Sequence, residues 1–272
     1  MKFGYREDTD KTTIPHFEAK HKTLADLPAA VSLGACLTEE VLDQGQHGAC
    51  GGHGSAEGTY AAAKAHGLPL AFVPSPRGLY ALARSIARAR ENPAGTLPTL
   101  TDDGVEPRDV MAAIDKYGLM PITPEHVRDR DDPAPRYSDV DDTNVNSNVR
   151  VDEIVKEAGT KIPGATRIAV SPLNIASSIA SKSPVCFGIF VDSDFCSYAG
   201  GAPIGAQNQD DPDGGGHWMM LHSYRTGADG KLIFTLRNSW GPSWGDTGDA
   251  DVTEAFIVQI TDAYSMALKE TT

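Results

Sequence analysis

The sequence predicts an α+β fold, with a helical first half followed by a β-rich second half. Apolar residues recur at helical spacing in the first half, whereas short apolar runs separated by turn residues fill the last third. No internal repeat interrupts this division. Because helices and strands are segregated along the chain, we expect two lobes packed against each other with a cleft between them. A chain of 272 residues is long enough to bury a substantial core.

Three helices are expected in the first half. The segment from Cys50 to Gly67 is rich in alanine and ends at a glycine suited to a C-cap. Residues 76–92 and 106–119 carry apolar side chains at helical spacing. The first helix contains four glycines, each costing about 1 kcal/mol against alanine in a helix interior. We therefore expect tertiary packing to hold it, with another backbone close to its small residues.

The second half begins after an acidic stretch, 123–150, that has the composition of a long surface loop. Short helices are expected over 151–159 and 174–182, followed by a buried strand at 185–191. Residues 216–225 and 231–240 are expected to form neighbouring strands joined by the turn sequence TGADG. Residues 250–260 are expected to close the sheet.

The charge and the distribution of apolar residues argue against a nucleic-acid partner and against a membrane span. A net charge of −13 disfavours binding to a phosphate backbone, so no nucleic-acid partner is expected. No run approaches the roughly 20 apolar residues that a membrane span needs. The first residues also lack an apolar leader. These observations favour a cytoplasmic or virion-associated protein. They leave its oligomeric state open.

The four cysteines, Cys36, Cys50, Cys186 and Cys196, are too few and too scattered for a disulfide scaffold. Reduced thiols are the default expectation. A pairing of Cys36 with Cys186 or Cys196 stays open at this point.

Cys50 lies where a glycine-rich loop meets a predicted helix start, and such a position favours a thiolate. A free cysteine is more often only a small buried apolar residue, so a nucleophile needs a base and an orienting group. His217 opens a strand after three glycines, where a substrate backbone can approach Gly216. Asn238 ends the next expected strand, from which its amide can reach the His217 ring.

The segments DQGQHGAC, GGGHWMML and RNSWGPSWGDTG together resemble the papain-like (C1) cysteine peptidases, specifically their bacterial and viral branch without a long propeptide. The resemblance extends over nearly the whole chain from about residue 25. It implies an arm at 1–35 that contributes to the right lobe, a helical left lobe at 36–150 that carries the nucleophile, and a β-barrel-like antiparallel right lobe at 151–272. The active site would lie in the cleft between the lobes.

The resemblance also implies roles for single residues. Cys50 would attack the scissile carbonyl as a thiolate paired with the His217 imidazolium, forming an acyl-enzyme. Asn238 would orient His217, and Trp240 would shield that hydrogen bond. Gln44 would donate to the oxyanion, which is typically the largest single contribution to such catalysis.

Further residues would contact the substrate. Trp244 would line the leaving-group side, and Gly104 would offer backbone to an extended peptide, as strand addition does. The implied partner is a peptide or protein substrate, with no cofactor and no metal.

Two neighbours of Cys50 depart from the family pattern. His47 replaces a cysteine that normally forms a disulfide, and Gly51 replaces a bulky aromatic residue, which predicts extra room beside the cleft. The segment before the family-like part is too short for the long inhibitory propeptide of secreted relatives. The acidic loop 128–150 is then a candidate cover for the cleft.

Three other functions remain open. The chain could be an inactive papain-fold binding or structural protein, for example a phage or particle component. The same triad could instead serve an amidase or a transpeptidase. His47, Cys50 and His53 also have a spacing compatible with zinc, although Gln44 and Asn238 are then unexplained.

Overall fold

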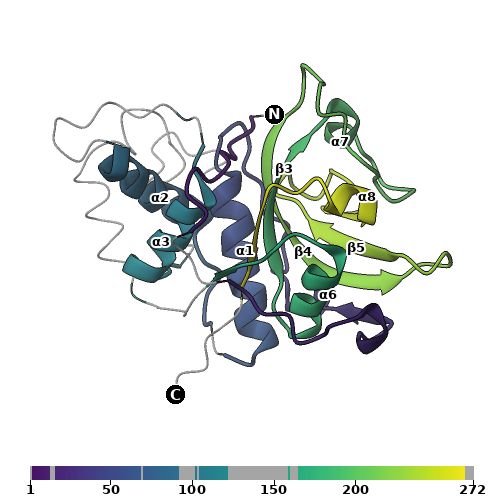
Figure 1. Ribbon diagram of the computed structural model, residues 1–272. Coiled ribbons are helices and arrows are strands. Elements are labelled where there is room, and N and C mark those ends of the chain that lie inside the picture. Colours follow the sequence, from purple (N-terminus) through teal and green to yellow (C-terminus); the bar gives the residue numbers. More distant parts are fainter. Residues whose placement is uncertain are drawn as a thin grey trace.

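The structure is a computed structural model that describes residues 2–12, 16–68, 70–91, 102, 104–121, 159 and 165–266. Three helices form one side of the molecule and an antiparallel sheet forms the other (Figure 1). The predicted α+β class is confirmed. The acidic loop 123–150 and nearly all of the expected helix 151–159 lie outside the described residues. None of the helices in the described ranges is long and apolar enough to cross a membrane.

The three predicted helices of the first half are confirmed. They are α1 (Cys50–Ala65), α2 (Pro76–Glu91) and α3 (Pro107–Tyr117). Gly67 follows α1 at φ +70° and Gly118 follows α3 at φ +87°, a backbone conformation that glycine adopts without a steric penalty. Two short 3-10 helices, η1 (Leu24–Asp26) and η2 (Gly34–Cys36), precede them.

Helix α1 tolerates its glycines because other elements pack directly against its backbone. A Cβ atom on Gly52 would lie 2.1 Å from the Pro76 carbonyl oxygen of α2. On the opposite side, a Cβ on Gly54 would meet Trp218 at 2.9 Å, and one on Gly58 would meet the Cys186 sulfur at 2.4 Å. The expected close approach is therefore present on two faces of the helix.

The sheet has seven strands, in the order β2-β7-β3-β4-β5-β6, with β1 added along β4. The strands are β1 (Ala30–Ser32), β2 (Thr166–Arg167), β3 (Val185–Val191), β4 (Gly215–Thr226), β5 (Leu232–Arg237), β6 (Asp249–Thr253) and β7 (Asp262–Ser265). Strands β4 and β5 are antiparallel neighbours, as expected, with an irregular register between Leu221 and Ser223. This pairing places the residue after β5, Asn238, near the start of β4.

Helix α1 packs on one face of the sheet, and α6 (Pro172–Ala180), α7 (Ser193–Cys196) and α8 (Glu254–Ile257) lie on the other side (Figure 1). The expected strand over 250–260 is only partly right, because β6 ends at Thr253 and α8 begins at the next residue. The strand β7 then inserts between β2 and β3. One apolar core lies among α1, α2, α3 and the sheet, and a second lies on the far face of the sheet.

All four cysteines are free, so neither of the alternative disulfides of Cys36 is formed. Cys186 lies against α1, where its thiol donates to the Gly54 carbonyl oxygen at 3.2 Å. Burial raises the pKa of this thiol beyond the ordinary range of a cysteine. Cys186 is thus an inert core residue.

Candidate active site

Cys50 is the first residue of α1 and is fully buried between the helices and the sheet. Backbone N–H groups of Trp218, Gly4 and Gly51 point at its sulfur and favour the thiolate. Burial outweighs them and raises the pKa of the thiol to about 11. In this arrangement the sulfur is held as a neutral thiol at neutral pH.

His217 lies on β4 and forms a hydrogen bond from Nε2 to the Asn238 side-chain oxygen, at 2.7 Å. Since an amide oxygen only accepts, Nε2 carries the proton and Nδ1 of the neutral ring has a free lone pair. Nδ1 is buried and has no partner among the described residues. Burial lowers the pKa of His217 to about 4, although the bond to Asn238 acts in the other direction.

Trp240 covers the His217–Asn238 pair. Its ring stacks on the His217 ring with centroids 4.4 Å apart and planes inclined by 20°. Trp244 packs edge-on against Trp240 at 5.8 Å and donates its indole N–H to the Phe195 carbonyl oxygen at 3.0 Å. Trp240 therefore covers one face of the imidazole, and Trp244 packs against Trp240.

Gln44 is attached to the segment that follows β5. Its backbone N–H donates to the Ser239 carbonyl oxygen at 2.9 Å, and its side-chain oxygen accepts from the Ser239 hydroxyl at 2.7 Å. These two bonds fix the amide so that Nε2 faces the cleft. There Nε2 donates to the carbonyl oxygens of Lys2, at 3.1 Å, and of His47, at 2.8 Å.

The segment Lys2–Asp8 is the first part of the arm expected at 1–35, and only this segment is called the arm from here on. It lies over these residues, between the helices and the sheet. Phe3 packs edge-on against the rings of His217 and Trp240, each at 6.4 Å. Tyr5 stacks on Trp218 at 5.9 Å, and its backbone N–H donates to the Gly216 carbonyl oxygen at 3.2 Å. In Figure 1 the N-terminal end of the chain correspondingly lies where the helices meet the sheet.

Gly4 lets the arm approach the nucleophile. A Cβ on Gly4 would lie 1.9 Å from the Gly48 carbonyl oxygen, and a Cβ on Gly104 would lie 1.9 Å from the Gly4 carbonyl oxygen. Only glycine fits at both positions. The backbone that pairs with the arm belongs to Val105, one residue beyond Gly104, through bonds to the Gly4 oxygen at 3.0 Å and from the Arg6 nitrogen at 3.1 Å.

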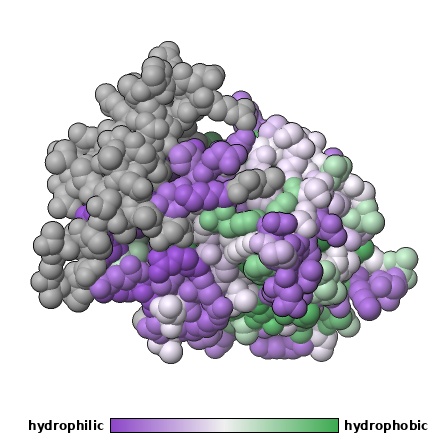
Figure 2. Space-filling model, turned by 90° about the horizontal axis from the view of Figure 1, so that it is seen from above, coloured by the Kyte–Doolittle hydropathy of each residue, from purple (hydrophilic) through white to green (hydrophobic). Residues whose placement is uncertain are grey.

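The Tyr5 hydroxyl and Asp8 anchor the arm. The Tyr5 hydroxyl donates to an Asp262 carboxylate oxygen at 2.5 Å. One oxygen of Asp8 accepts from the first turn of α3, at the Arg108 backbone, and the other accepts from Arg167 in β2. Asp8 therefore connects the helical side to the sheet side. Seen from above, the coloured surface on the side of the helices is mostly hydrophilic, whereas the side of the sheet mixes pale, hydrophobic and hydrophilic patches (Figure 2).

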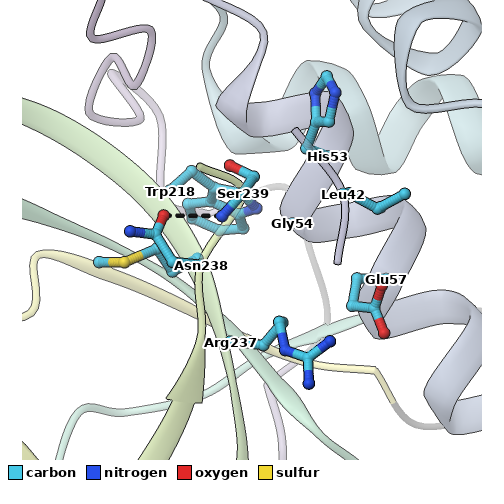
Figure 3. A pocket seen from close by; sticks show the side chains of 9 residues that line it. Leu42, His53, Gly54, Glu57, Trp218, Arg237, Asn238 and Ser239 are labelled. Atoms are coloured by element: carbon cyan, nitrogen blue, oxygen red, sulfur yellow. Dashed lines mark hydrogen bonds between the residues drawn. The ribbon is translucent and has the colours of Figure 1, made fainter. Parts of the chain in front are cut away.

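A narrow pocket lies behind the site, between α1 and the strands β4 and β5 (Figure 3). His53 and Glu57 line it from α1, and Arg237, Asn238 and Ser239 line it from the sheet. The Asn238 side-chain oxygen also accepts from the Ser239 backbone N–H at 2.7 Å. Because that oxygen holds both His217 and the backbone of Ser239, the amide orientation of Asn238 is fixed.

The surroundings of Cys50 differ from the sequence-based expectation at Gly51 and at His53. The extra room predicted beside Gly51 is absent, because the Val105 side chain fills it and a Cβ there would meet Val105 at 2.7 Å. The proposed zinc ligand His53 instead has its Nδ1 2.8 Å from the Ala49 carbonyl oxygen. No group of three metal-ligating side chains occurs within the described ranges.

The sequence profile described as "Papain family cysteine protease" matches residues 123–266, just over half of the 272 residues. The chain belongs to the papain family of cysteine proteases. His217, Asn238, Trp240 and Trp244 lie inside the matched segment. Cys50 and Gln44 precede the matched segment.

Single relatives agree with this assignment. Vignain from Vigna mungo is 32% identical over 95 residues, which are 35% of this chain and 25% of Vignain. The match thus spans about a quarter of that curated relative. Xylellain, a cysteine protease from Xylella fastidiosa, shares 21% identity with a TM-score of 0.74 and coverage of 98% of this chain and 96% of that chain. Procathepsin L 3 of Tenebrio molitor shares 19% identity with a TM-score of 0.64, and the match covers 94% of this chain and 73% of that chain. These two structures establish the fold.

The cleft contains features that sequence reasoning missed. The arm was expected only as an extended segment, and the acidic loop 128–150, the predicted cover, lies outside the described residues. Two aromatic residues, Phe3 and Tyr5, within a polar stretch were the available signal for its docking. Ser239 lies in the segment RNSWGPSWGDTG, but the sequence alone did not predict its hydrogen bond to Gln44. Asp102, which contacts the arm, gave no signal in the sequence.

Proposed function

We propose that this chain is a cysteine peptidase held in a covered state by its own arm. The observation that carries the proposal is the buried His217–Asn238 pair at 2.7 Å, which leaves Nδ1 of His217 unpartnered among the described residues, while the backbone N–H of the next residue, Trp218, points at the Cys50 sulfur. A thiol at a helix start, a base and an orienting amide together satisfy the requirements of nucleophilic catalysis. Family membership supports the same reaction class.

The proposed reaction begins when the Cys50 proton moves to Nδ1 of His217. The thiolate attacks the scissile carbonyl carbon, forming a C–S bond, while the Gln44 side-chain amide and the Cys50 backbone N–H donate to the oxyanion. The C–N bond then breaks, and the His217 imidazolium gives its proton to the leaving amine. Water, deprotonated by His217, releases the acyl group and restores the thiol.

The arm must leave before a peptide can enter, because Gly4 and Phe3 occupy the space over Cys50 and His217. Burial keeps the pair neutral, since it raises the pKa of Cys50 and lowers that of His217, and we propose that the arm contributes to this burial. Admission of solvent removes the cost of the charged pair. Peptides or proteins are the proposed substrates, bound at Gly216 and at the Gly104–Val105 edge. A cytoplasmic or virion-associated location remains a prediction, with which four free cysteines agree.

The epoxide thiol trap E-64, read by peptide mass mapping, tests the proposal. In the Gly4→Ala chain the new methyl group would overlap the Gly48 carbonyl, so we expect the arm to be displaced. We expect labelling of Cys50 at least about tenfold faster than in the parent chain, which corresponds to roughly 1.4 kcal/mol of lost arm binding.

Glu7→Ala is the matched control, because Glu7 is exposed on the arm and bonds only to Lys11 among the contacts described. It should label at the parent rate. His217→Ala in the Gly4→Ala background should suppress labelling. Absence of Cys50 labelling in Gly4→Ala, with modification only at other thiols, would favour a papain-fold binding protein instead. Product analysis with an added amine acceptor separates hydrolysis from transpeptidation.

A further inference from the structure

Asp102 is a largely buried carboxylate, with its side chain 10% exposed, and its oxygens contact the loop that precedes Cys50. Its two oxygens accept from the Gly48 backbone N–H, each at 3.1 Å, and one accepts from the Tyr80 hydroxyl at 2.8 Å. The Tyr80 hydroxyl in turn accepts from the Gly104 N–H at 3.2 Å. The carboxylate is therefore held rigidly between the loop that carries Cys50 and the edge that pairs with the arm.

The arm places a cation on this carboxylate. The Lys2 ammonium lies 2.8 Å from a carboxylate oxygen of Asp102, and the Asp102 side chain is only 10% exposed. The His47 ring also lies near Asp102, with its Nδ1 3.8 Å from a carboxylate oxygen. Burial acts to raise the pKa of Asp102, but the hydrogen bonds from Lys2, Tyr80 and the Gly48 backbone hold it well below the usual range of an aspartate.

The carbonyl oxygen of the same residue, Lys2, accepts from the Gln44 side-chain N–H at 3.1 Å. Gln44 is the proposed oxyanion donor. One lysine thus contacts the oxyanion donor with its carbonyl and Asp102 with its side chain. A single lysine residue is therefore long enough to place its carbonyl at the oxyanion donor and its ammonium on Asp102.

We propose that Asp102 is a specificity-determining residue that selects lysine or arginine at the substrate residue supplying the scissile carbonyl. This inference rests on the proposed peptidase function. When the arm leaves, Asp102 loses its ammonium partner, and a substrate cation restores the charge-assisted hydrogen bond in a nearly water-free position. A neutral side chain leaves the carboxylate without that partner.

The test uses two peptides that differ only at this residue, one with lysine and one with norleucine, a neutral side chain of similar length. Both are assayed with the full chain carrying Gly4→Ala. We expect kcat/KM to be about tenfold or more higher for the lysine peptide, which is roughly 1.4 kcal/mol of differential binding in the transition state. The preference should fall as salt is raised.

Asp102→Asn keeps an oxygen acceptor for Gly48 and Tyr80 but removes the charge. It should bring the lysine-to-norleucine ratio close to one while the norleucine peptide is still cleaved, which shows that the site is folded. Asp194→Asn, an exposed aspartate on α7, removes the same charge elsewhere and should leave the ratio unchanged. A ratio near one with Asp102 intact, or a ratio unchanged in Asp102→Asn, overturns the inference.

A binding experiment separates this inference from the proposed function. Fluorescence anisotropy of both labelled peptides is measured with the inactive Cys50→Ser, Gly4→Ala chain. Tighter binding of the lysine peptide, lost in Asp102→Asn, supports the selectivity even if neither peptide is cleaved. Equal binding of the two peptides contradicts it whether or not turnover occurs. Failure of cleavage and of E-64 labelling contradicts the peptidase function alone.

Discussion

The Asn238 side-chain oxygen accepts from both the His217 ring and the Ser239 backbone, and the Ser239 hydroxyl in turn holds Gln44. Two adjacent residues after β5 therefore orient the proposed base and the proposed oxyanion donor. This coupling explains how a short segment can position groups from both sides of the cleft. It also gives Ser239 a positioning role that can be separated from substrate binding.

Ser239→Ala removes the hydroxyl that fixes the Gln44 amide and leaves the backbone bond between the two residues. We expect kcat and kcat/KM to fall together by several-fold, consistent with loss of about 1 kcal/mol from a hydrogen bond that matters most in the transition state. Peptide hydrolysis in the Gly4→Ala background measures this. Ser243→Ala, at an exposed serine nearby, is the control. A rise in KM with unchanged kcat would contradict the positioning role.

Helix α1, which begins at the proposed nucleophile, contacts its neighbours through glycines. Gly52 faces α2, whereas Gly54 and Gly58 face the sheet, so the helix lies close to neighbours on both sides. Close packing substitutes for the helix propensity that these glycines lack. It also fixes the N-terminus of α1, and with it the Gly51 backbone N–H that points at the Cys50 sulfur.

Gly52→Ala tests this packing at the element scale. In an exposed helix this change stabilises by about 1 kcal/mol. Here the methyl group would overlap the Pro76 carbonyl oxygen at 2.1 Å, so α1 and α2 must separate. We expect a net loss of about 1–3 kcal/mol in the free energy of unfolding. Denaturant unfolding measures it, with Gly205→Ala, which has open space around its Cβ position, as the control. Increased stability of Gly52→Ala would disprove the packing account.

At the scale of the whole molecule, the arm joins the two sides of the cleft and controls the solvent around the proposed catalytic pair. Asp8 bonds to the start of α3 and to Arg167 of β2. Tyr5 bonds to Asp262 at the start of β7. The helical side, the sheet side and the arm are consequently joined by one hydrogen-bond network. The neutral state of Cys50 and His217 follows from that burial rather than from the residues themselves.

The pH dependence of Cys50 alkylation by iodoacetamide tests this account. A thiol whose pKa is raised to about 11 is protonated below that pH, so the parent chain should react appreciably only as the pH approaches 11. Displacement of the arm in Gly4→Ala removes much of the desolvation and allows the imidazolium to form. The reaction should then proceed near pH 7, with a clear shift of the profile to lower pH. Identical profiles for the two chains would show that the arm does not control the thiol.

Much of the fold could be predicted, because helical periodicity and buried strands are local patterns. The helices from Cys50, Pro76 and Pro107 and the neighbouring strands β4 and β5 were expected near their observed positions. The end of β6 was missed, since the apolar run that continues into α8 has no turn signal. The space beside Gly51 was also misjudged, because Val105, which fills it, is distant in sequence.

The sequence by itself determined the family and the order of Gln44, Cys50, His217 and Asn238, because those residues lie in short segments with recognisable neighbours. Only the tertiary structure decided that the arm covers them, that Val105 supplies the paired backbone, and that Lys2 meets Asp102. Residues 2 and 102 are 100 positions apart, and their contact leaves no trace in local composition or periodicity. Such contacts arise only when the packing of helices against the sheet brings distant backbone together.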